Sequence, residues 1–314
     1  MGTLGTSVPG VTIAASTVPG GTPGVVGSPQ TGYVLTSHRV IQGHDPGDRF
    51  GHAVAFVGDL NGDSVQEYLV GAPMYQAELP NYVTVGAGYA ELFRMDSATP
   101  LVHIAGTQDG TANPPIGGEA FGFAVAGGFD LNGVGGPEIV IGAPLFDVDA
   151  DEVARKAQAG RVCAYSVDVG VPGDPLVTPF LEDDAPNGTI MVGRAGSVQF
   201  GFSVAVMPDI NGDLANDIIV GAWQDDIDDD SFASCTPPPN PEPRISFGGS
   251  ASVFSPGSLT PETPVLIFYG EEGRDHMGRA VAATDLFGSS GFPEIILSGV
   301  AWTPPGFEAP TYPT

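Results

Sequence analysis

The chain has 314 residues, of which 37 are acidic and 10 are basic, giving a formal net charge of -27. A surface of this sign repels phosphate backbones and anionic lipid and attracts cations, so no nucleic acid is expected as a partner. The 46 glycines and 30 prolines favour many short strands joined by tight turns over long helices.

The first segment, residues 1–31, is rich in Gly, Pro and Thr and is expected to be flexible. It has neither the basic start nor the continuous apolar stretch of a signal peptide, and no run of about 18 apolar residues occurs in the chain. We therefore expect no direct membrane insertion. Residues 303–314 are Pro-rich and are expected to form a tail or a linker to other domains of a longer chain.

Between these segments, residues 32–302 are organised by an internal repeat. Four units align without gaps over most of their length and start near residues 50, 121, 200 and 277, which are 71, 79 and 77 residues apart. A period of this length, with several strand-like stretches and almost no helical periodicity, is typical of a radial array whose units share a core. The prediction is an all-β fold, a β-propeller of four-stranded antiparallel blades.

In the unit that starts at Phe50, four stretches predict the strands of one blade. Residues 53–55 are small or β-branched and suit an innermost strand, and residues 68–70 form an apolar run that predicts burial between neighbouring blades. Residues 88–93 alternate apolar and mixed residues, as in a half-exposed third strand, and residues 101–105 predict the fourth. In the next two units the fourth strand is predicted at residues 189–192 and 265–269.

Two loops between the first and second strands carry oxygen donors at positions 1, 3, 5 and 9. These donors are Asp59, Asn61, Asp63 and Glu67 in one loop and Asp209, Asn211, Asp213 and Asp217 in the other. A cation that takes six to eight oxygens can also recruit the position-7 carbonyl, of Val65 or Ala215. Three carboxylates in nine residues repel one another unless a cation lies among them. The sequence therefore predicts a calcium ion (Ca2+) in each loop, with a metal-free Asp/Asn/Gly-rich turn as the alternative.

The other two units carry weaker versions of this loop. The second unit has Val134 at position 5 and is a candidate for weak metal binding through its remaining donors. Those donors are Asp130, Asn132 and Glu138. The fourth unit keeps only Asp285 in register and is predicted to be empty. An EF-hand is excluded because position 12 is Val70 or Val220, inside a predicted strand.

Two units carry the same pair of motifs, FG followed by GAP, starting at Phe50 and Gly71 and again at Phe121 and Gly142. Through these motifs the sequence resembles the FG-GAP repeat family, the repeats of the N-terminal β-propeller of integrin α subunits. The third unit keeps FG at Phe200 but ends in GAW, and the fourth has Met in place of Phe and lacks GAP. The resemblance implies calcium loops at the same place in each blade and an extracellular binding module.

The number of blades is left open by the sequence. The unit from Met277 supplies only two strands, and residues 32–35 with residues 39–43 look like a third and fourth strand without a beginning. These halves would complete each other in one composite closing blade, giving four blades without exposed edges. Because the family usually has seven blades, a fragment of a seven-bladed ring is the alternative.

The longest loop between a second and a third strand runs from Trp223 to Gly248 and is acidic and aromatic. The resemblance implies that it lies on the face opposite the calcium loops, the face that integrins use for ligands, so a protein or glycan ligand is expected there. A disulfide between Cys163 and Cys235 would tie two neighbouring loops on this face, and two free cysteines are the alternative.

No catalytic motif such as G-x-S-x-G, H-E-x-x-H or a glycine-rich phosphate loop is present, so we expect no enzyme. His44, His52 and His276 fall near turns that enter innermost strands, where surface turn residues are the expectation. The hypothesis is a calcium-binding, integrin-like β-propeller that serves as an extracellular adhesion or ligand-binding module. Its location, secreted or at the cell surface, is inferred without a visible signal peptide. The alternatives are a non-catalytic propeller domain of a larger secreted hydrolase and a structural unit of a cell-surface assembly.

Overall fold

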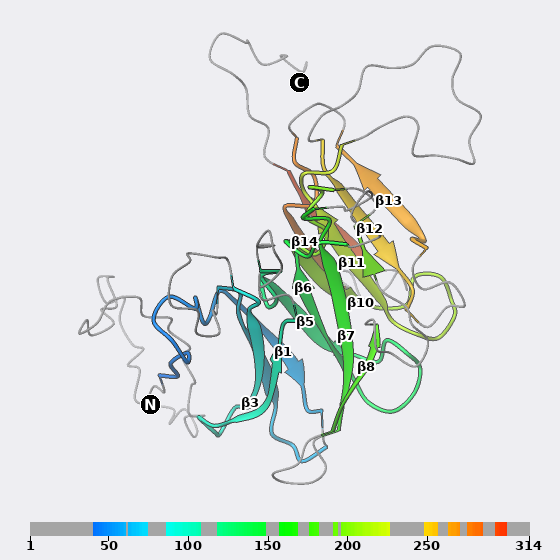
Figure 1. The fold of residues 1–314 in the computed structure, drawn as a ribbon. Helices are drawn as coiled ribbons and strands as arrows, with labels where there is room; N and C mark the ends of the chain where they lie inside the picture. Colours follow the sequence, from blue (N-terminus) through cyan, green and yellow to red (C-terminus); the bar gives the residue numbers. More distant parts are fainter. Residues whose placement is uncertain are drawn as a thin grey trace, which may run out of the picture.

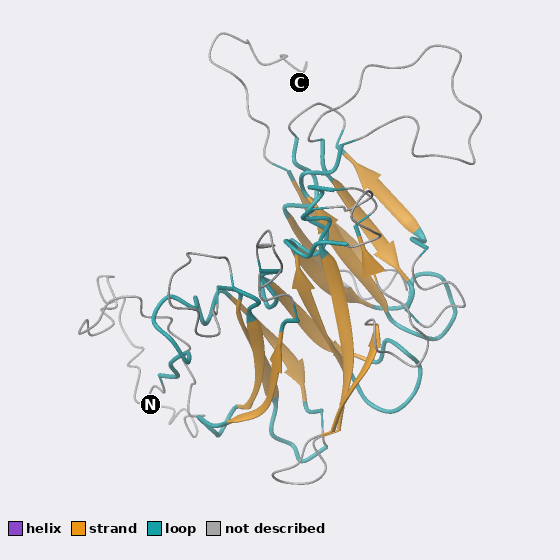
Figure 2. Cartoon of the chain, in the orientation of Figure 1, coloured by secondary structure: helices purple, strands orange, loops and turns teal. Residues whose placement is uncertain are grey.

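A computed structural model describes twelve stretches of the chain. They are residues 40–60, 62–74, 86–107, 118–148, 157–168, 176–181, 191–193, 196–226, 248–256, 263–270, 275–284 and 293–299. The regular elements in these stretches are all strands, which confirms the all-β prediction (Figure 2). The described part of the chain contains no helix with the length and apolar character of a membrane span.

The strands form antiparallel sheets that follow the repeat. The first blade contains β1 (Ala53–Gly58), β2 (Glu67–Ala72), β3 (Tyr89–Arg94) and β4 (Pro100–Ala105) in that order. The second contains β5 (Ala124–Phe129), β6 (Glu138–Ala143), β7 (Arg161–Asp168) and β8 (Leu176–Leu181), with β9 (Met191–Val192) also paired to β7. The third contains β10 (Ser203–Met207), β11 (Asp217–Ala222), β12 (Ser250–Phe254) and β13 (Leu266–Tyr269). The last sheet contains β14 (Ala280–Thr284) and β15 (Glu294–Ser298).

The blades pack side by side in chain order, with each innermost strand against the next (Figure 1). The second strands β2, β6 and β11 are buried at every residue, as their apolar runs predict. One apolar cluster joins the first blade to the second, and Phe121 of the FG motif lies inside it with Leu69 and Ile139. A second cluster joins the second blade to the third through Val140 and Val220. The core of the protein is therefore the set of seams between blades.

The glycines of the two motifs explain why the motifs recur. A Cβ on Gly71, the first residue of GAP, would lie 1.9 Å from the carbonyl oxygen of Gly122, the FG glycine of the next blade. Gly122 itself has a φ of 85°, which favours glycine, and its N–H donates to the Gly142 carbonyl of its own blade at 3.2 Å. The two motifs thus mark the point where the backbones of neighbouring blades come closest.

The fourth strand of the second blade differs from the prediction. Only Met191 and Val192 of the predicted residues 189–192 form a strand within the described residues, and they pair with the start of β7. The rest of β7 pairs with β8, which was not predicted. The physical reason is length, because β7 has eight residues whereas β3 has six, and it holds two partners one after the other.

The two ends of the array expose faces that are covered elsewhere. Val54 and Phe56 of β1 are 44% and 66% exposed, and Ile296 of β15 is 51% exposed. In the described residues, β14 and β15 pair only with each other, and Ile41 packs on the first blade rather than on β15. Residues 40–43 of the strand predicted at residues 39–43 form no strand, because this segment packs on the first blade instead of pairing with a sheet edge. Residues 32–39 lie outside the described part, as do both predicted terminal segments, so closure of the ring and the domain limits stay predictions.

Candidate metal centre

Three loops connect the first and second strands of their blades, and we call them the first loop (residues 59–67), the second loop (residues 130–138) and the third loop (residues 209–217). They share one hydrogen bond, from the N–H at position 2 to the carboxylate at position 9, where the second strand begins. Its partners are Leu60 and Glu67 at 2.8 Å, Leu131 and Glu138 at 2.7 Å, and Ile210 and Asp217 at 2.7 Å. The position-9 carboxylate is therefore buried at the root of each loop.

In the third loop, backbone N–H groups turn the acidic side chains inward. Asp209 accepts from the N–H groups of Gly212 at 2.7 Å and Leu214 at 2.8 Å. Asp213 accepts from the Ala215 N–H at 3.0 Å and from the hydroxyl of Ser255, beyond β12, at 2.6 Å. Burial alone would raise the pKa of Asp213, but these hydrogen bonds outweigh it and lower the pKa. The loop thus holds the carboxylates of Asp209 and Asp213 at its mouth.

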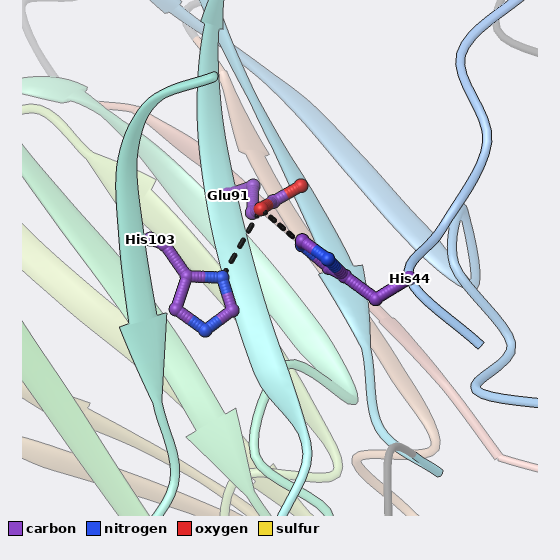
Figure 3. A group of neighbouring side chains, drawn as sticks. All are labelled: His44, Glu91 and His103. Atoms are coloured by element: carbon purple, nitrogen blue, oxygen red, sulfur yellow. Dashed lines mark hydrogen bonds and ion pairs between the residues drawn. The ribbon is translucent and has the colours of Figure 1, made fainter. Parts of the chain in front are cut away.

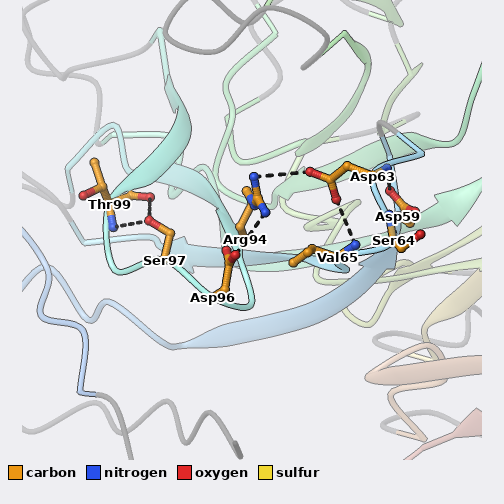
Figure 4. A network of polar contacts seen from close by, with 8 residues as sticks. All are labelled: Asp59, Asp63, Ser64, Val65, Arg94, Asp96, Ser97 and Thr99. Carbon is orange, nitrogen blue, oxygen red and sulfur yellow. Dashed lines mark hydrogen bonds and ion pairs between the residues drawn. The ribbon is translucent and has the colours of Figure 1, made fainter. Parts of the chain in front are cut away.

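The first loop repeats this arrangement with one change (Figure 4). Asp59 accepts from the Ser64 N–H at 2.7 Å, and Asp63 accepts from the Val65 N–H at 2.8 Å. The other oxygen of Asp63 forms an ion pair with the Arg94 guanidinium at 3.2 Å, where the third loop has a hydroxyl. Asn61, the predicted position-3 ligand, lies outside the described residues.

The position-9 carboxylates of the first and third loops each keep one buried oxygen without a hydrogen-bond partner in the described structure, Glu67 Oε1 and Asp217 Oδ1. Burial, with the neighbouring acidic groups of each loop, raises the pKa of Glu67 and raises that of Asp217 to about 6. An unsatisfied buried oxygen costs on the order of 1–3 kcal/mol. A cation bound in each loop would satisfy the unpaired oxygen of that loop and would lower the raised pKa of its position-9 carboxylate. The residues present therefore fit calcium.

The second loop provides the contrast. Glu138 Oε1 accepts from the Asn132 amide at 2.7 Å and from the Ser166 hydroxyl at 2.9 Å, so both of its oxygens have protein donors. Burial still raises the pKa of Glu138 to about 7. The Asp130 side chain accepts from the Gly133 N–H, and Val134 places no oxygen at position 5. With both Glu138 oxygens hydrogen-bonded and no oxygen at position 5, this loop has fewer unsatisfied donors for a cation than the other two, and its weak metal binding stays a prediction.

Sequence reasoning missed the residue that lies five positions after the first residue of each third strand, opposite position 9 of the loop in the first two blades. Arg94, Ser166 and Ser255 occupy corresponding positions there and contact the loop of their own blade. Aligning the third strands as carefully as the FG and GAP motifs would have found them. Asp285 and Cys235 lie outside the described residues, so the predictions on the fourth loop and on the disulfide stay predictions. Within the described part, Cys163 is buried on β7.

No protein-family model matches the chain. Its curated relatives include integrin alpha pat-2 of Caenorhabditis briggsae, 39% identical over 110 residues that cover 35% of this chain and 8% of that protein. Integrin alpha-3 of Mus musculus is 29% identical over 202 residues, covering 63% of this chain and 16% of that protein. Integrin alpha-IIb of Mus musculus is 29% identical over 197 residues, which cover 61% of this chain and 16% of that protein. The chain thus matches only a small part of the length of each relative. Together with the four-stranded blades and their FG and GAP motifs, these matches place the chain among the FG-GAP β-propellers similar to integrin α subunits.

Proposed function

We propose that this chain is a calcium-binding, integrin-like β-propeller module that binds a protein or glycan ligand outside the cell. The observation that carries the calcium part is the pair of unsatisfied buried oxygens on Glu67 and Asp217, set against the fully satisfied Glu138. When bound, calcium supplies positive charge to three carboxylates in each loop. The side chains at positions 1, 3, 5 and 9 and the position-7 carbonyl would hold it.

The face opposite these loops supports the ligand-binding part. A ladder of rings runs across the starts of the innermost strands, with centroids 4.5 to 5.2 Å apart. It consists of His52, Phe123, Phe202, Trp223 and His276. The Arg279 guanidinium lies over the Trp223 ring at 5.1 Å, so the ladder already binds a cation of the chain itself. A basic side chain of a protein ligand is the chemistry that suits this aromatic surface on a chain with a net charge of -27.

The calcium part is tested by calorimetric titration of the chelator-treated protein. We expect two calcium ions per chain, one ion in Asp59→Ala or in Asp209→Ala, and none in the double variant. Asp130→Ala in the second loop is the matched control and should leave the stoichiometry at two. Loss of a site in Asp130→Ala, or full binding in the double variant, would contradict the assignment.

The ligand part is tested by retention of purified matrix proteins and glycans on the immobilised chain. We expect calcium-dependent retention that falls on Phe202→Ala in the ladder and is unchanged by Leu214→Ala at the tip of the third loop. Retention that survives Phe202→Ala would place the ligand elsewhere. Since the relatives are integrin subunits, a binding role is proposed and a catalytic one is not.

A further inference from the structure

A cluster of two histidines and a glutamate lies on the first blade, away from the calcium loops (Figure 3). Glu91 on β3 is paired across the sheet with His103 on β4, so the two side chains lie on the same face. His44 reaches them from the segment before β1. Glu91 Oε1 is 2.7 Å from His44 Nε2 and 3.1 Å from His103 Nδ1, and one ligand atom of each residue lies within 4.8 Å of the others.

The structure of the first blade fixes the orientation of this cluster. The neighbours of Glu91 on β3, Ala90 and Leu92, pack toward the second blade, so Glu91 points to the opposite face of the sheet. The Tyr89 ring contacts both imidazoles, with centroids 5.1 Å from His44 and 5.0 Å from His103. The Tyr89 ring thus restricts the orientation of both histidines.

The backbone before β1 is fixed as well. The His44 N–H donates to the Tyr89 hydroxyl at 3.2 Å, and that hydroxyl donates to the buried Asp48 carboxylate at 2.8 Å. A Cβ on Gly43 would lie 2.2 Å from Asp48 Oδ2, so glycine is required for this close approach. The position of His44 is therefore set by the fold.

We propose that His44, Glu91 and His103 form a zinc-type transition-metal site. The Glu91 side chain is 3% exposed, whereas His44 and His103 are 51% and 42% exposed, so a buried carboxyl group faces two accessible imidazoles. Two nitrogens and one carboxylate oxygen are a zinc ligand set, whereas calcium takes oxygen ligands. The site is thus chemically distinct from the calcium loops and does not depend on the function proposed for them.

The spacing of the ligand atoms fits an ion after a small adjustment. Bonds of about 2.0–2.2 Å in a tetrahedral site place ligand atoms roughly 3.3 Å apart. The two distances from Glu91 Oε1, 2.7 and 3.1 Å, are shorter by a few tenths of an ångström. The two imidazoles are half exposed and can open by that amount while Glu91 stays in place. The fourth position is then left to water.

The test is titration of the calcium-saturated protein with zinc, and with cobalt as a spectroscopic probe. We expect one zinc ion per chain and the visible absorption of tetrahedral cobalt. His44→Ala and His103→Ala should each weaken binding by at least about tenfold, as should Glu91→Gln. His52→Ala removes an exposed histidine outside the cluster and should leave zinc binding unchanged.

The two histidine variants keep the test decisive if Glu91→Gln fails to fold, because their side chains are half exposed and their melting temperatures should stay close to that of the parent. Equal zinc binding in the His44→Ala/His103→Ala double variant would show only ions held by the acidic surface and would overturn the proposal. Absence of zinc binding in the parent protein would also overturn the proposal. The cluster would then be only two imidazoles hydrogen-bonded to a carboxylate.

Discussion

Arg94 distinguishes the first loop from the third, and its replacement should strengthen the calcium binding that we propose for the first loop. Arg94 Nη1 lies 3.2 Å from Asp63 Oδ2, at position 5 of the loop, and Nη2 lies 3.0 Å from Asp96. An incoming calcium ion must share Asp63 with a guanidinium that repels it. Two unit charges about 4 Å apart interact by roughly 1 kcal/mol in water, and about twice that for a divalent ion. Because Arg94 is partly exposed and shared with Asp96, we expect about 1–2 kcal/mol.

Arg94→Ser places the residue of the other two blades at this position and should raise the calcium affinity of the first loop about five- to thirtyfold. The measurement is calorimetric titration in an Asp209→Ala background, where only the first loop binds. Arg279→Ser is the matched control, because it removes one positive charge on the opposite face. An unchanged affinity in Arg94→Ser, or an equal rise in Arg279→Ser, would refute the reasoning.

Three further predictions concern the fold. Glu119→Gln removes the negative charge 2.6 Å from the buried Arg161 guanidinium and should lower the free energy of unfolding in urea by about 3–5 kcal/mol. A loss below about 1 kcal/mol would contradict a stabilising role of this ion pair. Gly71→Ala should part the first two blades, because its Cβ would meet the Gly122 carbonyl, and native-like hydrogen exchange in β2 would argue against this. Burial raises the Glu138 pKa from 4.5 to about 7, so its contribution favours the folded protein below pH 4.5 and is lost as pH rises through 7. Glu138→Gln in calcium-free buffer should therefore show a smaller fall in melting temperature between pH 5 and 8, and an unchanged pH profile would count against the shift.

Much of the blade could be predicted because its strands have a strong local signature. The apolar run at residues 68–70 lies inside β2, and the predicted residues 101–105 lie inside β4. Burial on both faces gives the second strand a continuous apolar run after its first residue, which a sequence pattern reveals directly. The length of β7 and its two partners have no such signature, so β8 was missed.

In the candidate sites too, residues close together in sequence could be predicted, whereas residues that only the fold brings together could not. The proposed loop ligands are close together in the sequence and follow a fixed spacing, so the sequence alone could propose them. Arg94 and Ser255 contact those loops from another strand, and their effect depends on the register of the blade. Glu91 and His103 meet because β3 pairs with β4, and His44 joins them from the distant segment before β1. The histidines at residues 52 and 276 join the aromatic ladder, away from this cluster.

The central claim is that calcium completes the first and third loops, and thermal unfolding of the chelator-treated protein tests it most directly. Calcium at a hundredfold excess over its dissociation constant stabilises the folded state by roughly 2.7 kcal/mol per site. We expect a rise in melting temperature of about 5 °C or more with calcium, little change with magnesium, and no calcium effect in the Asp59→Ala/Asp209→Ala variant. An unchanged melting temperature in the folded parent protein would show that the loops are metal-free turns.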